Sequence, residues 1–124
     1  MTALFDTGVL LDHLTGRPEA AELFAVHAHG AVSVISWVEV MSVAPPGLDE
    51  ATRVFLQRFE RLALNEAIAD RAVTLLRVHP RLTVPRALIY ATALINSLPF
   101  VSVDLPAELL TESTIVVPYQ RIAS

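Results

Sequence analysis

Three carboxylates and one arginine lie at the ends of apolar runs, or inside them. The acids are Asp6, Glu39 and Asp104, and the arginine is Arg86. An ion beside apolar residues must be paired or hydrated, because burying it alone costs more free energy than a small domain can lose. Three acids that converge in the fold therefore predict a bound cation. Oxygen ligands suit Mg²⁺ or Mn²⁺, and the reaction that such an ion would promote here is phosphodiester hydrolysis.

Each acid also has a simpler interpretation. Asp6 is a suitable N-cap for a helix that starts at Gly8, and Asp104 is one for a short helix after it. Glu39 fits the solvated face of an amphipathic helix. Asp12 is expected to face solvent or to cap the turn at Gly16 rather than to join a site.

Short apolar segments alternate with helical patterns, which predicts a mostly parallel sheet covered by helices. We expect five short strands near residues 2–5, 31–35, 62–64, 100–103 and 115–117. We expect helices near residues 8–14, 18–28, 36–44, 48–61, 66–78 and 85–97, with a turn at 105–110. Because the carboxyl ends of parallel strands line a common crevice, this fold brings the three acids to one edge.

Composition narrows the choice of function. The 124 residues fit one domain, residues 1–124, and 53% of them are hydrophobic, which predicts apolar surface for self-association or a protein partner. There is no cysteine, so thiolate metal sites and disulfides are excluded. The net charge of −4 argues against coating nucleic acid by charge alone. No segment is long and apolar enough to cross a membrane, and we expect a soluble, cytoplasmic protein.

Other catalytic classes lack their motifs. The histidines are not spaced as zinc ligands, no serine lies in a Gly-x-Ser-x-Gly turn, and no glycine-rich phosphate loop is present. The arginines at 53, 58 and 61 are mixed with acids, so an ion-paired, solvated face is favoured over an RNA contact.

Four motifs in order resemble the PIN domains, and within them the VapC-type toxins of bacterial toxin–antitoxin pairs. The segments 4–14, 32–39, 85–94 and 98–104 are similar to the family's first strand, its glutamate helix, its Pro-Asp-Ala-Leu helix and its last acidic strand. The resemblance implies a three-layer α/β/α domain, usually a homodimer, that cuts RNA with Mg²⁺ or Mn²⁺ and is silenced by a VapB-like antitoxin.

The resemblance also implies roles for individual residues. Asp6, Glu39 and Asp104 match the family's metal-binding and catalytic acids. Thr7 matches the small hydroxyl residue after the first acid, and Ser102 matches the Thr or Ser two positions before the last. Glu108 is a candidate replacement for the family acid that is absent here.

Two positions depart from the family pattern. Gly8 stands where Asn or Ser is common, and Arg86 stands where the family has an aspartate. An arginine in the first turn of a helix opposes the dipole by about 0.3 to 1 kcal/mol, so an acid nearby should offset it. Antitoxins of the family insert an arginine into the acidic pocket, and we expect Arg86 to act as a built-in version of that plug. We therefore expect a Mg²⁺- or Mn²⁺-dependent endoribonuclease that Arg86 weakens. The alternative is a catalytically impaired protein- or RNA-binding module, and a third possibility is a small structural domain without an active site.

Overall fold

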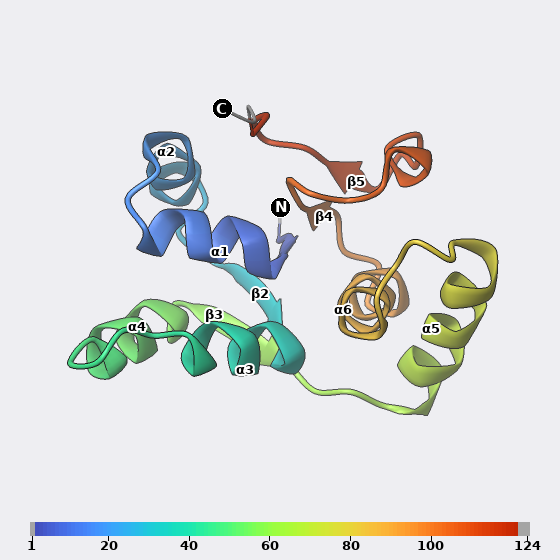
Figure 1. Ribbon diagram of the computed structural model, residues 1–124, viewed down its shortest axis with the longest axis horizontal. Coiled ribbons are helices and arrows are strands. Elements are labelled where there is room, and N and C mark those ends of the chain that lie inside the picture. Colours follow the sequence, from blue (N-terminus) through green and yellow to red (C-terminus); the bar gives the residue numbers. More distant parts are fainter. Residues whose placement is uncertain (1, 122–124) are drawn as a thin grey trace.

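A computed structural model describes residues 2–121 as five parallel strands and six α-helices around them (Figure 1). The strands are β1 (Leu4–Phe5), β2 (Gly30–Ser33), β3 (Phe59–Leu62), β4 (Phe100–Val101) and β5 (Ile115–Val116). The helices are α1 (Thr7–Leu14), α2 (Pro18–Val26), α3 (Val34–Ser42), α4 (Asp49–Leu56), α5 (Glu66–Val78) and α6 (Val84–Ile95), with a 3₁₀ turn η1 at Ala107–Leu109. The α/β fold expected from the sequence is confirmed, with every strand parallel to its neighbour.

The sheet separates two hydrophobic clusters because neighbouring residues of a strand point to opposite faces. Leu4 and Phe100 belong to the cluster under α5 and α6. Phe5 and Val101 belong to the cluster formed with α1, α2 and α4. Figure 1 shows these two groups of helices on opposite sides of the sheet, as in a three-layer domain.

Aromatic rings fill the second cluster. Phe5 lies 4.9 Å from Phe24 and 5.7 Å from Phe59, measured between ring centroids. Gly30 on β2 makes room for this packing, because a Cβ at that position would lie 2.5 Å from Cε2 of Phe5. The first two strands can therefore sit side by side with a large ring between sheet and helices.

One predicted helix was too long, and the strand after it was misplaced. Residues 48–61 were expected to be helical and 62–64 to form the next strand, but α4 ends at Leu56 and β3 spans Phe59–Leu62. These four residues pair with all four residues of β2, which satisfies backbone groups that would otherwise be exposed at its edge. Sheet pairing thus overrides the helical spacing of the apolar residues.

The strand order β3-β2-β1-β4-β5 places a topological switch point at β1. The chain passes to one side of β1 to form β2 and to the other to form β4, so the carboxyl ends of β1 and β4 lie side by side. A crevice at such a point is where parallel α/β sheets bind ligands. Within residues 2–121, none of the helices has the length and apolar character needed to span a membrane.

Candidate functional site

Asp6 is the buried centre of the site. It directly follows β1, and none of its surface is exposed. Its Oδ1 accepts a hydrogen bond of 2.8 Å from the Thr7 backbone N–H, and its Oδ2 accepts one of 2.6 Å from the Ser102 hydroxyl. Nε of Arg86 lies 3.3 Å from the same Oδ2. The carboxylate therefore caps α1, as its simpler interpretation requires, and also contacts two more elements.

The pKa of Asp6 reflects competition between burial and these contacts. Burial raises the pKa above its ordinary value, because the charged form loses its hydration. The positive charge of Arg86, together with the hydrogen bonds from Ser102 and Thr7, lowers the pKa, and the negative charge of Asp104 raises it. Burial prevails, so this carboxylate depends strongly on the arginine beside it.

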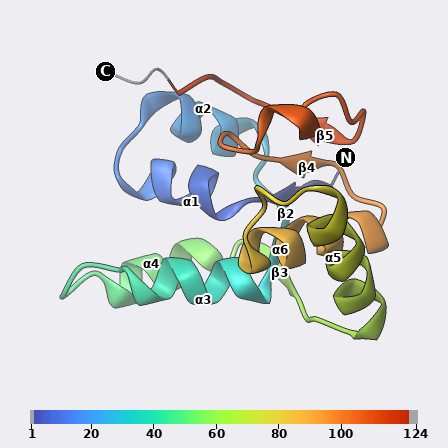
Figure 2. The ribbon, with the colours of Figure 1, turned by 45° about the vertical axis from the view of Figure 1, so that its right-hand side comes forward.

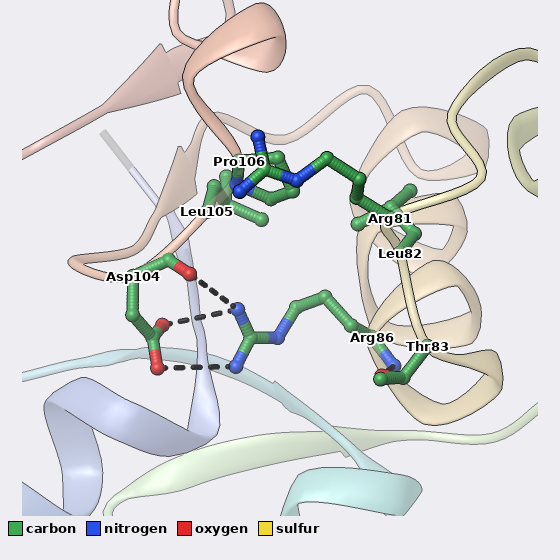
Figure 3. A pocket seen from close by; sticks show the side chains of 7 residues that line it. All are labelled: Arg81, Leu82, Thr83, Arg86, Asp104, Leu105 and Pro106. Atoms are coloured by element: carbon green, nitrogen blue, oxygen red, sulfur yellow. Dashed lines mark hydrogen bonds and ion pairs between the residues drawn. The ribbon is translucent and has the colours of Figure 1, made fainter.

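Arg86 joins Asp6 to Asp104. Its Nη1 lies 3.0 Å from Oδ1 of Asp104 and 3.3 Å from the Asp104 carbonyl oxygen, and its Nη2 donates to Oδ2 at 3.3 Å. Figure 3 shows the two side chains pointing toward each other, and both line a pocket of about 350 Å³. Planar guanidinium donors match a carboxylate in this way better than a lysine does.

The start of α6 fixes the position of this arginine. Thr83 caps the helix by accepting a hydrogen bond from the Arg86 backbone N–H at 3.3 Å, and Pro85 occupies the first turn, where its missing N–H costs nothing. From there the side chain reaches across to β1 and β4. The two acids offset the unfavourable placement of a cation at a helix N-terminus.

Glu39 approaches the site from α3 through Thr7. The Thr7 hydroxyl donates to Oε1 of Glu39 at 2.7 Å and lies 2.9 Å from the Ser36 hydroxyl. Since the Thr7 backbone N–H also binds Asp6, this one threonine connects both acids. The structure thus brings Asp6, Thr7, Glu39, Ser102 and Asp104 to the carboxyl edge of the sheet. Their roles with a metal stay predictions.

The remaining candidates have other partners. Glu108 forms an ion pair of 3.9 Å with Arg81. Asp104 was weighed as the cap of the turn after it, but η1 begins after Pro106, and the Asp104 carboxylate pairs with arginine instead. Asp12, expected to face solvent or to cap a turn, is mostly covered, with 15% of its side chain exposed.

The main partner of Asp12 is Arg121, a residue that the sequence did not indicate as part of the site. Two nitrogens of Arg121 donate to Asp12 at 3.0 and 2.8 Å, and Tyr119 donates to it at 2.7 Å. Burial opposes ionisation, but these hydrogen bonds outweigh it and lower the pKa of Asp12. Arg121 also lies 3.5 Å from Oδ2 of Asp104, so a second arginine reaches the site. Arg121 lies in none of the motifs that resemble the family. The sequence signal near it is Gly8, which replaces the Asn or Ser that is common in the family.

In this arrangement the residues do not fit a divalent cation. The Arg86 guanidinium already provides positive charge between Asp6 and Asp104. Across residues 2–121, no three His, Cys, Asp or Glu side chains are grouped so that they would hold a metal ion. Mg²⁺ needs several oxygen ligands or waters around it. Here the guanidinium donors already contact the carboxylate oxygens that would coordinate the ion.

Comparisons with known proteins agree with this fold. The PIN domain family matches residues 3–105. The structure resembles a toxin–antitoxin complex from Klebsiella pneumoniae, with 32% sequence identity, a TM-score of 0.87, and coverage of 97% of this chain and 100% of that one. No curated protein matches the sequence.

Two more distant structures share the fold. One is VapBC2 from Rickettsia felis bound to a DNA fragment from its promoter, at 15% identity and a TM-score of 0.72, with 94% of this chain and 96% of that chain covered. The other is DNA-bound VapBC from Salmonella typhimurium, at 20% identity and a TM-score of 0.67, with 82% and 86% covered. PIN domains generally depend on a metal, whereas here the Arg86 guanidinium lies between Asp6 and Asp104.

Proposed function

Because this chain belongs to the PIN-domain family, we propose that it is a VapC-like toxin component that acts by binding an antitoxin-like protein and, in the state described, does not cleave RNA. The likeness to the toxin–antitoxin complex of Klebsiella pneumoniae supports such a partner. The observation that carries the proposal is the bridge from Arg86 to Asp6 and Asp104. This proposal takes the alternative that the sequence offered, a catalytically impaired PIN domain, in place of the endoribonuclease that the sequence favoured.

The bridge has a clear chemical consequence. A guanidinium supplies positive charge and hydrogen-bond donors, but it has no ligand position that binds and ionises a water molecule. It therefore neutralises the acids without supplying the hydroxide that phosphodiester hydrolysis needs. Removing Arg86 alone would leave the buried Asp6 without its main compensating charge, so we expect that change to destabilise the fold.

An apolar groove supports a protein partner. It lies between α1, α3 and α4, has a volume of about 280 Å³, and is lined by Leu11, Leu14, Val40, Leu48 and other residues. Leu14 is 38% exposed and Leu48 is 51% exposed. Apolar surface gathered in a concave site is typical of places where an amphipathic helix docks. We propose that a VapB-like antitoxin occupies this groove.

The second candidate is a Mg²⁺- or Mn²⁺-dependent endoribonuclease weakened by Arg86. It is favoured by the five polar residues that still meet at the carboxyl edge of the sheet, namely Asp6, Thr7, Glu39, Ser102 and Asp104. For this function the Arg86 guanidinium must first leave both acids. The two candidates therefore differ in whether Arg86 stays in place.

Cleavage of a mixed RNA pool with Mn²⁺ or Mg²⁺ separates them. Four proteins are compared: wild type, Asp6→Ala, Arg86→Asp, and the double variant Arg86→Asp with Asp6→Ala. We expect no cleavage by wild type above the background of the double variant. For Arg86→Asp we expect a rate about 100-fold or more above that background, since the change replaces the guanidinium with the family's acid at the reacting centre. The double variant should be silent.

Cleavage by wild type that disappears in Asp6→Ala would overturn the proposal and establish the second candidate. Cleavage that survives in Asp6→Ala would belong to a contaminating nuclease. Circular dichroism melts of each variant show whether the changes leave the domain folded.

A further inference from the structure

The last described residues form a strap across α1, which we define as residues 117–121. The chain leaves β5 and runs back past α2, as Figure 2 shows, and its side chains bond to residues of α1. Nη2 of Arg17 donates to the Gln120 carbonyl at 3.1 Å, and the Arg17 guanidinium lies 4.9 Å from the centre of the Tyr119 ring. The Tyr119 hydroxyl donates to Asp12 at 2.7 Å. Polar contacts thus hold the strap in place.

Arg121 extends from the strap into the acidic site. It binds Asp12 through two nitrogens, donates to the Gly8 carbonyl at 3.0 Å, and lies 3.5 Å from Oδ2 of Asp104. Asp104 is therefore held between two arginines, with Arg86 on the other side. One of the acids that match the family's metal ligands thus lies within ion-pair distance of two arginines of this chain, with 35% of its side chain exposed.

Gly8 provides the space for this contact. A Cβ on Gly8 would lie 3.1 Å from Nη2 of Arg121 and 3.3 Å from Oδ2 of Asp104. Gly8 is the second residue of α1, directly after Thr7. The departure of Gly8 from the family pattern and the approach of Arg121 are thus two parts of one arrangement.

We propose that the strap is an autoinhibitory element, in which Arg121 enters the notch at Gly8 and competes with divalent cations for Asp104. This inference rests on the proposed function and adds a second arginine to it. The strap contacts the domain mainly through polar groups at its surface, and segments of this kind open at low free-energy cost. Its release would remove the Arg121 contact from Oδ2 of Asp104 without unfolding the sheet, while Arg86 keeps its own contacts to the same residue.

Binding of Mn²⁺ alone, measured by titration calorimetry, tests the strap. The starting protein is Arg86→Asp, and Arg121→Gln is added to it. The matched control adds Arg77→Gln, which removes the same charge from an exposed site on α5. We expect Arg121→Gln to tighten Mn²⁺ binding by at least about fivefold, the lower end of typical coupling between sites. The control should change it less than twofold.

A second variant tests the notch itself. Gly8→Ala leaves Arg121 in the chain but puts a Cβ 3.1 Å from its Nη2, so that nitrogen must shift by a few tenths of an ångström. The change should therefore tighten Mn²⁺ binding less than Arg121→Gln does, and it should speed amide hydrogen exchange in residues 117–121. Arg17→Gln should speed the same exchange by removing the contacts to Tyr119 and Gln120. The autoinhibitory role of the strap would be overturned if Mn²⁺ affinity were equal with and without Arg121, or if the Arg77→Gln control tightened Mn²⁺ binding as much.

The outcomes distinguish this inference from the proposed function. If wild type binds Mn²⁺ as tightly as Arg86→Asp, the proposed function fails, and Arg121→Gln is then compared in the wild-type background. If no variant binds Mn²⁺, including Arg86→Asp with Arg121→Gln, the strap is overturned as a gate for cations, while a binding-only function stands.

Discussion

At the scale of single residues, the site depends on one buried carboxylate and the charges around it. Asp6 has no exposed surface, yet it accepts hydrogen bonds from Thr7 and Ser102 and pairs with Arg86. A buried charge that loses its partner costs far more than the pair contributes when intact. Arg86 is therefore needed for stability, and it is also the group that lies between Asp6 and Asp104 where a metal ion would bind.

This dependence predicts how Arg86→Met changes stability with pH. Burial raises the pKa of Asp6 in the folded protein, so the folded state holds a proton that the unfolded state loses near its ordinary pKa of 3.8. The folded state then loses stability as the pH rises through the raised pKa. Without Arg86 that pKa rises further. We expect a cost of about 3 kcal/mol at pH 7 and a much smaller cost near pH 4.

Urea unfolding at both pH values measures the effect. Arg77→Met is the control, because it removes an exposed arginine of the same size from α5. A cost for Arg86→Met that is the same at pH 4 and pH 7 would show that Asp6 does not depend on the arginine's charge.

At the scale of elements, the start of α6 determines where Arg86 lies. Thr83 accepts a hydrogen bond from the Arg86 backbone N–H, which fixes the first turn from which the side chain extends. The helix packs on α5 and Leu4 of the central strand through the cluster that contains Ala87, Tyr90 and Ala91. A rigid helix thus presents a long side chain to the ends of two strands.

We predict that Thr83→Ala destabilises the domain by about 1 kcal/mol, the usual cost of losing a helix N-cap. Thermal unfolding measures the change. The control is Thr74→Ala, because that exposed threonine of α5 contacts its own helix only weakly, at 3.4 Å from the Asp70 carbonyl. A melting temperature lowered equally by both substitutions would contradict a specific role for the cap.

The sequence predicts most of the elements because their signals are local. Pro18 marks the start of α2, and apolar periodicity indicates α5 over the residues where it occurs. The boundary between α4 and β3 could not be predicted in this way. It depends on the pairing of β3 with β2, a long-range interaction that the local spacing of apolar residues does not indicate. Arg121 was missed for the same reason: its partners on α1 lie at the other end of the chain.

At the scale of the whole molecule, the exposed apolar surfaces determine where a second copy of the chain or a partner protein could bind. The apolar groove between α1, α3 and α4 is open in the single chain, and Leu48 is 51% exposed there. Other exposed valines lie elsewhere, including Val26 on α2 and Val78 on α5. A homodimer and an antitoxin-like partner would each need such a surface, so the two must use different ones if they bind together.

We predict that the chain forms a homodimer that leaves the groove open for an antitoxin-like partner. Leu48→Glu places a charge in the groove, so it should lower the fluorescence of an apolar dye such as ANS, which binds exposed apolar sites. It should not change the dimer mass measured by sedimentation velocity. Val26→Glu is the matched control, since it adds the same charge to an exposed apolar position outside the groove. If Leu48→Glu produces monomers and Val26→Glu does not, the groove is the contact between two copies of this chain, and an antitoxin-like partner must bind another face.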